Sequence, residues 1–414
     1  MFRNITTFVI AILLLGVAAG VVAQQTPVQE LGDEIFEDAN LSINNNQSCA
    51  TCHDDAWGST GPDSFINAHG GVYEGSIPGT FGDRKPPETD YSTLSPVLHF
   101  NKGKWVGGSF WDGRATGERL GWPAADQAQG PFLNPAEQAL PDPACVVYRV
   151  SVSVYALLYE EVFGDNIFTI DFPPETDTLC AGGDSVPLSV DDRAKVETEY
   201  DSIALAIAEY EAGPGERSFS SRFDASLKGQ YKLTKQERRG LALFMGKAGC
   251  KSCHPASGQL ALFTEFTYDN LGVPSNPENP ALLADPGFRD RGLGGFLQSR
   301  GEAEEVGKAE LGKMKVPTLR NVGQKPTPES VKAYTHNGYF KSLKGIVHFY
   351  NTRDVKPECP NPLTTMEDAI AMDCWPAPEI ADNVNTSDIG DLGLTDAEED
   401  AIVAFLETLS DDFL

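Results

Sequence analysis

Beyond residue 23, the chain of 414 residues lacks any apolar run that approaches the roughly 20 residues needed for a membrane-spanning helix. Basic residues are also scarce, because 32 Lys and Arg stand against 60 Asp and Glu, giving a formal charge of −28. A chain this acidic repels the phosphate backbone, which excludes nucleic acid as a partner. We therefore expect no stable membrane insertion of the mature chain. The acid excess is compatible both with attraction of a basic protein partner and with simple solubilisation.

The first 23 residues have the pattern of an export signal. Arg3 provides the positive start, residues 8–17 form a short apolar stretch, and residues 21–23 offer small side chains before a cleavage site. The length of this segment favours a removed signal peptide over a permanent anchor. We expect the mature chain to be exported, most simply into a bacterial periplasm.

Two copies of one five-residue pattern carry most of the functional information: C-A-T-C-H at residues 49–53 and C-K-S-C-H at residues 250–254. C-x-x-C-H is the attachment pattern of c-type haem, in which both thiols bond to the porphyrin and the adjacent histidine binds iron. Two copies behind an export signal predict two covalent haems; the alternative is four cysteines in disulfides with two idle histidines. The predicted attachment residues are Cys49, Cys52, Cys250 and Cys253, and the predicted proximal iron ligands are His53 and His254.

Four further cysteines, Cys145, Cys180, Cys359 and Cys374, can pair in three ways. The sequential pairing, Cys145 with Cys180 and Cys359 with Cys374, is favoured because each pair then lies within one loop-rich insertion. Closing a loop of about 15 residues stabilises a fold by roughly 3 kcal/mol. An oxidising compartment disfavours the alternative of four free thiols.

A weak internal repeat precedes the two haem motifs. Residues 32–36 and residues 240–244 are similar, and each lies in a short helical segment that leads to an attachment site. Residues 70–87 and 274–294 are rich in glycine and proline, which predicts long loops. The fold class is therefore mainly α: two cytochrome c-like haem domains with long connecting loops, in which haem supplies much of each apolar core.

A domain boundary is predicted at residues 213–215, Gly-Pro-Gly, which end an amphipathic helix over residues 193–212. The last helix opens with a capping box, Thr395 and Glu398, and could pack back on the amino-terminal domain. The predicted division is a signal peptide at 1–23, an amino-terminal haem domain at 24–215 and a carboxy-terminal haem domain at 216–414.

Six short stretches occur in one order through the mature chain: F-W-D-G-R at 110–114, Q-A-Q-G-P at 127–131, N-P-A-E at 134–137, S-R-F-D at 221–224, V-P-T-L-R-N at 316–321 and H-N-G at 336–338. With the two haem motifs, they resemble the dihaem cytochrome c peroxidase family, which includes the MauG-type enzymes. Each stretch alone is weak evidence, and it is their shared order that carries the resemblance.

The resemblance implies a peroxidatic haem at His53 and an electron-transfer haem at His254. Trp111 matches the tryptophan between the haems, where an oxidisable indole shortens an electron-transfer step; plain core packing is the alternative. Glu137 matches the distal acid that moves a proton between the two peroxide oxygens. Gln127 matches a second polar residue of that pocket.

The other iron ligands differ between the two branches of the family that the chain resembles. His69 follows His53 at nearly the spacing of a removable distal histidine in the peroxidase branch, which MauG-type members lack; its ligation is therefore conditional. Tyr350 lies on the apolar face of a helix predicted after Ser342, at a position that carries methionine in peroxidases and tyrosine in MauG-type enzymes. A phenolate there would lower the potential of the second haem. Met314 is the competing ligand.

The primary interpretation is a periplasmic dihaem peroxidase that reduces hydrogen peroxide to water with electrons from a small donor protein, a cytochrome c or a cupredoxin. The first alternative is a MauG-like oxidase that modifies side chains of a partner protein, which Tyr350 favours and His69 opposes. The second is a dihaem electron carrier without chemistry. The family's interdomain Ca²⁺ is left open, because residues 323–334 lack the expected Thr-x-Pro, and a homodimer is left open too.

Overall fold

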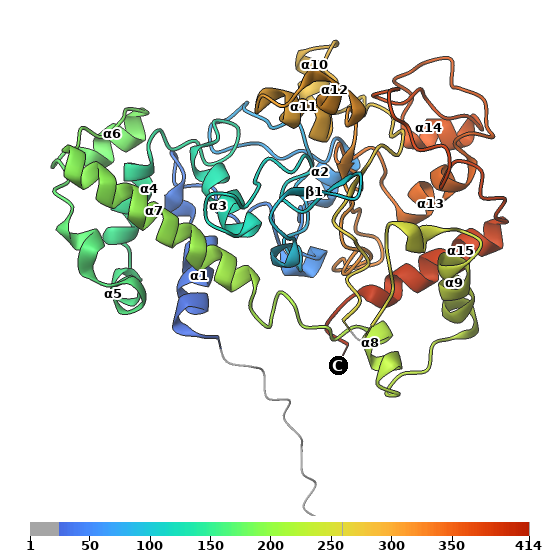
Figure 1. Cartoon of the computed structure of the whole chain (residues 1–414), viewed down its shortest axis with the longest axis horizontal. Coiled ribbons are helices and arrows are strands. Elements are labelled where there is room, and N and C mark those ends of the chain that lie inside the picture. Colours follow the sequence, from blue (N-terminus) through green and yellow to red (C-terminus); the bar gives the residue numbers. More distant parts are fainter. Residues whose placement is uncertain (1–24, 259, 414) are drawn as a thin grey trace, which may run out of the picture.

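The computed structural model describes residues 25–258 and 260–413, so the predicted signal peptide lies outside the described residues. The described part is mainly helical with a few short strands, as predicted. Its amino-terminal and carboxy-terminal halves lie side by side, with long loops between and over them (Figure 1). The helix before the predicted boundary spans Val190–Glu211 and ends just short of residues 213–215.

The amino-terminal half is organised around one long helix, α7, against which α1, α3 and α4 pack (Figure 1). A buried cluster centred on Leu31, Ile35 and Ile203 fills the space between these helices. Its elements are α1 Pro27–Glu37, α2 Ser64–Ala68, β1 His99–Asn101, β2 Lys104–Val106, α3 Pro123–Leu133, α4 Pro143–Ser151, α5 Ala156–Phe163, α6 Thr176–Gly182 and α7 Val190–Glu211.

The carboxy-terminal half is centred on α15, against which α9 and α13 pack. Phe244, Phe263 and Phe405 meet there with their rings at steep angles, a favourable aromatic arrangement. Its elements are α8 Arg222–Leu227, α9 Lys235–Met245, β3 Tyr268–Asp269, α10 Pro280–Ala284, α11 Gly292–Ser299, α12 Glu304–Ala309, β4 Met314–Lys315, α13 Leu343–Thr352, α14 Met366–Ala371 and α15 Asp396–Leu406.

The internal repeat has a packing reason. At Gly32 on α1, a Cβ would overlap the carbonyl oxygen of Ala206 on α7; at Gly240 on α9, a Cβ would overlap that of Ala401 on α15. In each half, the glycine therefore lets the helix before the haem motif lie directly against the main helix of that half. The repeat marks two equivalent helix crossings, each of which leads the chain into an attachment motif.

The last helix does not pack back on the amino-terminal half. Helix α15 lies against α9 and α13, so that expectation is corrected. The tail beyond it makes the contact instead, because the Tyr91 hydroxyl donates to the Asp411 carboxylate at 2.6 Å. The predicted loop at residues 274–294 is also interrupted, by α10 and the start of α11. Helix α10 has its own start signal, since Asn279 caps it and Pro280 occupies the first turn.

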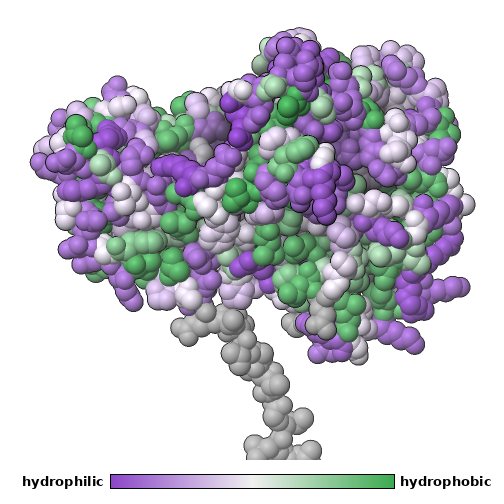
Figure 2. All heavy atoms as spheres, viewed as in Figure 1, coloured by the Kyte–Doolittle hydropathy of each residue, from purple (hydrophilic) through white to green (hydrophobic). Residues whose placement is uncertain are grey.

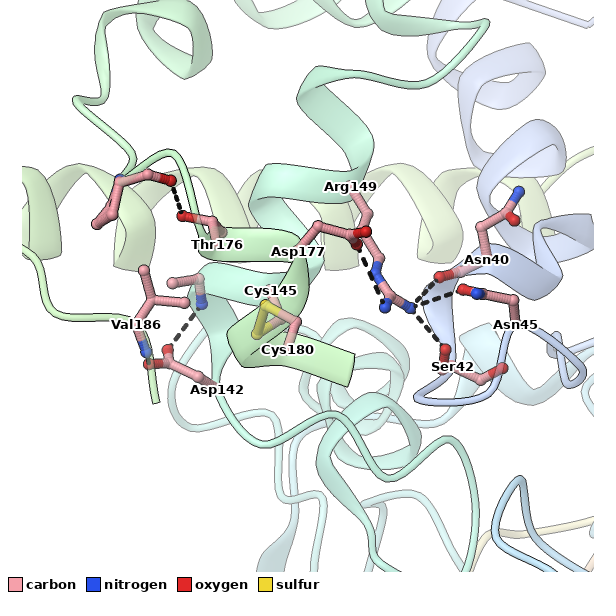
Figure 3. Close-up of a disulfide and its surroundings, with 12 residues drawn as sticks. Asn40, Ser42, Asn45, Asp142, Cys145, Arg149, Thr176, Asp177, Cys180 and Val186 are labelled. Carbon is pink, nitrogen blue, oxygen red and sulfur yellow. Dashed lines mark hydrogen bonds and ion pairs between the residues drawn. A yellow bond between two sulfur atoms is a disulfide. The ribbon is translucent and has the colours of Figure 1, made fainter. Parts of the chain in front are cut away.

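Both predicted disulfides are present, Cys145–Cys180 and Cys359–Cys374. Figure 3 shows the first, which joins α4 to α6 in the insertion at the edge of the amino-terminal half. One helical turn further along α4, the Arg149 guanidinium points toward the segment before the first haem motif and donates to the carbonyl oxygen of Ser42 at 2.6 Å (Figure 3). The insertion is thereby fixed to the chain that leads into that motif.

A buried ion-pair cluster ties the two halves together. Arg84 of the amino-terminal half donates to Asp290 of the carboxy-terminal half at 2.6 and 2.7 Å, and to Asp112 at 2.7 Å. Burial opposes ionisation of Asp290, but the hydrogen bonds and charge of Arg84 outweigh it and lower the pKa of that carboxyl to about 2. Asp112 follows Trp111, so this cluster fixes the segment that carries the tryptophan at the junction of the halves.

The visible face in Figure 2 is mostly hydrophilic along its upper margin, over α10 to α12, with hydrophobic side chains grouped along its lower middle. Among the helices of the described residues, none has the length and apolarity to span a bilayer.

Candidate functional site

The two C-x-x-C-H histidines are held in the same way. The ring Nδ1 of His53 lies 3.0 Å from the carbonyl oxygen of Ser59, and that of His254 lies 2.6 Å from the carbonyl oxygen of Phe263. Burial lowers the pKa of both imidazoles to about 4, so each ring is neutral at physiological pH. A neutral ring whose Nδ1–H donates to a carbonyl presents the lone pair of Nε2, which is the form that binds a metal.

The four motif thiols are free, so the alternative that they form disulfides is wrong. Both motifs adopt one turn, in which the histidine N–H donates to the carbonyl of the first cysteine, at 3.1 Å for His53 and 2.9 Å for His254. Burial raises the pKa of the thiols, to about 12 for Cys52 and Cys250 and about 11 for Cys253. These thiols are therefore protonated at neutral pH, which disfavours a thiolate metal site, and Cys250 and Cys253 line a cavity.

A large apolar cavity lies beside the second motif. Its empty space, open mouth included, is about 1720 Å³. Cys250, Cys253 and His254 line one side, and the Leu343, Ile346, Val347 and Tyr350 face of α13 lines another. Ser342 caps α13 by accepting from the N–H of Gly345, as the sequence predicted. The helical face expected from the spacing therefore faces the second attachment site.

A smaller cavity, with about 620 Å³ of empty space, lies beside the first motif. It is lined by His53 together with Gln127 of α3, Phe110 and Trp111. The proximal histidine and the predicted distal glutamine thus border one space. A cavity with a few convergent polar side chains is the usual form of a binding site.

Trp111 borders both cavities. Its side chain is buried, and its indole N–H donates to the carbonyl oxygen of Lys85 at 2.9 Å. The structure therefore brings Trp111 between the surroundings of His53 and those of His254, which plain core packing does not require.

Glu137 follows α3 in the turn that begins at Asn134. Burial raises the pKa of this carboxyl, while the nearby Arg114 guanidinium and a hydrogen bond from Asn134 oppose the rise. The negative charge of Glu137 in turn contributes to raising the pKa of Cys49 and Cys52. Glu137 therefore lies within electrostatic reach of the first attachment motif, although it is not among the side chains that line the smaller cavity.

The competing ligands of the second motif share one cavity. Tyr350 and Met314 both line the larger cavity. Burial raises the pKa of the Tyr350 phenol well above its usual range, and the charges of Cys250 and Cys253 add to the rise. Met314 lies on β4, with its methyl group near Gly292. Tyr350 therefore lies within electrostatic reach of both thiols of the second motif.

His69 is not brought to either cavity. It is exposed at the carboxyl end of α2, where its Nδ1 lies 2.8 Å from the carbonyl oxygen of Phe65 and its ring lies against the Phe65 ring. In this arrangement, His69 does not close the smaller cavity.

The donor set fits two c-type haems. Each motif supplies two free thiols and one neutral imidazole with Nε2 available, and each borders a cavity.

In the segment where the family's calcium was left open, the buried Lys332 ammonium donates to the carbonyl oxygens of Asn321 and Gln324 at 2.8 and 3.3 Å. Calcium remains a prediction. Sequence reasoning gave no role to Lys332, Lys85 or Lys315, because isolated lysines far apart in the sequence carry no spacing signal.

Comparison with known proteins gives a consistent family assignment. A family model described as di-haem cytochrome c peroxidase matches residues 27–232. The methylamine utilization protein MauG of Paracoccus denitrificans is 33% identical, over 95% of this chain and 92% of its own length. The cytochrome c551 peroxidase of Nitrosomonas europaea is 27% identical, over 83% of each chain.

Solved structures agree with this assignment. The crystal structure of the diheme peroxidase BthA from Burkholderia thailandensis matches with a TM-score of 0.72 and 28% identity, covering 94% of this chain and 87% of that one. The likeness therefore extends over both halves of the fold, including the part of the carboxy-terminal half beyond residue 232, where the match to the family model ends.

Proposed function

The chain belongs to the di-haem cytochrome c peroxidase family, a group of dihaem oxidoreductases, and on that premise we propose that it is an exported peroxidase. It reduces hydrogen peroxide to water, at a site beside His53, with electrons that enter through the surroundings of His254. The observation that carries the proposal is the position of Trp111, which borders both cavities while His53 and Gln127 border the smaller one.

Cys49 and Cys52 hold one haem and Cys250 and Cys253 the other, with His53 and His254 as proximal ligands. The proposed haem domains are residues 24–215 and 216–414. The haems supply the redox chemistry, in which one peroxide takes up two electrons and two protons and yields two waters.

The protein's own groups orient peroxide and move its protons. The Gln127 amide orients the oxygens of peroxide within the smaller cavity. The Glu137 carboxyl accepts the proton that leaves one oxygen and returns it to the departing oxygen, and its raised pKa suits both halves of that transfer. The indole of Trp111, fixed by its bond to the Lys85 carbonyl, connects the two cavities.

The electron donor is proposed to be a small redox protein, a cytochrome c or a cupredoxin, in the periplasm. The formal charge of −28 becomes more negative by one when Arg3 leaves with the signal peptide. An acidic surface attracts a basic donor at a rate that falls as ionic strength rises.

Steady-state turnover with hydrogen peroxide and reduced cytochrome c tests the proposal. Rapid oxidation of the cytochrome supports a peroxidase. Negligible turnover by protein that carries both haems contradicts it. A dihaem electron carrier would show two six-coordinate low-spin haems in every redox state and no reaction with peroxide.

We predict that Trp111→Phe slows electron transfer from the second haem to the first while both haems remain attached. The change removes the oxidisable indole but keeps an aromatic ring in the buried site. Stopped-flow absorbance, after peroxide is mixed with reduced protein, measures this step.

Trp122→Phe is the matched control for that substitution. Its indole also donates to a backbone carbonyl, that of Thr93 at 2.8 Å, but it lines neither cavity. An equal effect of both substitutions, or no effect of either, would contradict the role given to Trp111.

A second candidate function is a MauG-like oxidase that modifies side chains of a partner protein. Tyr350 near the second motif thiols and the exposed His69 favour it, as does the 33% identity to MauG. Peroxide-driven oxidation of a partner protein, with negligible turnover of cytochrome c, would select this candidate over the peroxidase.

We predict that Tyr350→Met changes the optical and EPR spectra of the second haem and raises its reduction potential. A thioether stabilises the reduced iron, whereas a phenolate stabilises the oxidised iron. Tyr334→Phe is the control, because Tyr334 lines the same cavity and its substitution leaves Tyr350 in place. An unchanged spectrum of the second haem in Tyr350→Met would show that Tyr350 is not its ligand.

A further inference from the structure

Three lysines, Lys85, Lys315 and Lys332, line the larger cavity, and Lys315 lines the smaller one as well. Each donates to two protein oxygens. Lys85 bonds the Thr60 hydroxyl at 2.8 Å and the Pro86 carbonyl at 2.6 Å. Lys315 bonds the Ser95 hydroxyl at 2.8 Å and the Gly108 carbonyl at 2.5 Å.

Lys332 repeats the pattern with the carbonyl oxygens of Asn321 and Gln324. An ammonium group has three N–H donors, so each of the three lysines keeps one donor for a further acceptor. Because all three side chains line the larger cavity, that acceptor can be a ligand within it.

The charges of these lysines are not balanced by the described protein. Lys85 and Lys332 are each only 6% exposed, and none of the three forms an ion pair with a carboxylate of the described residues. Buried charges are normally paired, because an unpaired one costs several kcal/mol. Burial lowers the pKa to about 8 for Lys85 and Lys315 and to about 7 for Lys332, where the charge of Lys85 adds to the effect.

One carboxylate, that of Glu88, lies within electrostatic reach of all three lysines, and their charges oppose the rise that burial causes in its pKa. Among the described residues, the carboxylates whose charges act on these ammonium groups are Glu88 and, for Lys332, also Asp90, so three cations stand against two anions and leave a net positive site. Glu88 and Lys315 line both cavities, whereas Lys85 and Lys332 line the larger one. The positive site therefore lies where ligands of the two cavities approach each other.

We propose that Lys85, Lys315 and Lys332, arranged around Glu88, bind the propionate carboxylates of both haems and so join the two cofactors through one charged cluster. The inference rests on the proposed attachment of two haems and not on the peroxidase activity. A carboxylate accepts the free N–H of a buried ammonium in a strong, charge-assisted hydrogen bond. The propionates supply the negative charge that the described protein does not.

The decisive variant is Lys315→Met, because Lys315 lines both cavities. Removing a positive charge near a haem favours its oxidised state, so the reduction potentials of both haems should fall. Lys332→Met should lower mainly the potential of the second haem. Spectroelectrochemical titration of protein shown by mass to carry two haems measures both potentials.

Lys341→Met is the matched control. Burial also lowers the pKa of Lys341 to about 8, and its ammonium has no hydrogen-bond partner among the described residues, but it lines neither cavity. Its substitution should leave both potentials unchanged.

Glu88→Gln is a second variant, which should shift the reduction potentials in the direction opposite to Lys315→Met. It removes the shared negative charge, so both potentials should rise. This variant decides the question if Lys315→Met does not yield a protein with two haems.

Unchanged potentials in two-haem Lys315→Met or Glu88→Gln protein, or equal shifts in Lys341→Met, would overturn the proposal. A wild-type chain with fewer than two haems would instead refute the proposed function, so the two failures are distinguishable.

Discussion

Glu137→Gln should lower peroxide turnover by about 100- to 10,000-fold, the usual range for loss of a positioned acid–base group. Glutamine keeps the size and polarity of the side chain but can neither accept nor return the proton of peroxide. Burial raises the pKa of the Glu137 carboxyl, while Arg114 and Asn134 oppose the rise, so the wild-type group takes up a proton more readily than an exposed carboxyl does. Steady-state assays at saturating donor measure the loss.

Glu160→Gln is the control for this substitution. Glu160 is an exposed carboxylate on α5, whereas Glu137 is half-buried and its charge acts on Cys49 and Cys52 of the first motif. The absorbance spectra of both variants should match the wild type, since neither residue holds a haem. Retention of more than about a tenth of the turnover by Glu137→Gln would remove Glu137 from the mechanism, because it falls outside the expected range.

Arg320→Met should destabilise the carboxy-terminal half by about 3–5 kcal/mol. The Arg320 and Asp224 side chains are 0% and 1% exposed, and the guanidinium donates twice to the carboxylate, at 2.5 and 2.9 Å. Removal of Arg320 leaves the buried Asp224 charge without its partner. Chemical denaturation, followed by the absorbance of the second haem, measures the loss of unfolding free energy.

The Arg320–Asp224 pair also predicts that the free energy of unfolding depends on pH. Burial alone would raise the pKa of Asp224, but the hydrogen bonds from Arg320 and Ser221 outweigh it, so the pKa is lowered in the folded state. A carboxyl with a lowered folded pKa contributes stability above its unfolded pKa of about 3.9, and this contribution is lost as the pH falls below that value. The difference in stability between wild type and Arg320→Met should therefore shrink below about pH 4.

Lys104→Met is the matched control for Arg320→Met. Its ion pair with Glu265 spans 3.3 Å, and the lysine side chain is 63% exposed. An exposed pair of this kind contributes about 0–1 kcal/mol. If Arg320→Met and Lys104→Met lost comparable unfolding free energy, the buried pair would not be a main source of stability for the carboxy-terminal half.

Local signals in the sequence predicted much of the fold. Ser342 and Thr395 form helix caps as expected, because a hydroxyl followed by a free N–H two or three residues later is a local hydrogen-bond pattern. The disulfide pairing followed from sequence proximity within insertions. The α13 face that lines the larger cavity followed from helical periodicity.

Contacts between distant segments could not be predicted in this way. Nothing local shows that Trp111 borders both cavities, and that position was available only from the resemblance to the family. The Lys85, Lys315 and Lys332 cluster joins two loops and strand β4, which are far apart in the sequence, so it has no spacing pattern. The packing of α15 on α9 depends on the close approach at Gly240, a single residue whose role appears only in three dimensions.

Intact-mass analysis of the exported chain tests the central claim most directly. We predict a mature chain with two covalently bound porphyrins, in which Cys49, Cys52, Cys250 and Cys253 are consumed by thioether bonds and the other four cysteines by two disulfides. A chain with one porphyrin or none, or with alkylatable thiols at either C-x-x-C-H motif, would contradict the claim that two linked haems perform its chemistry.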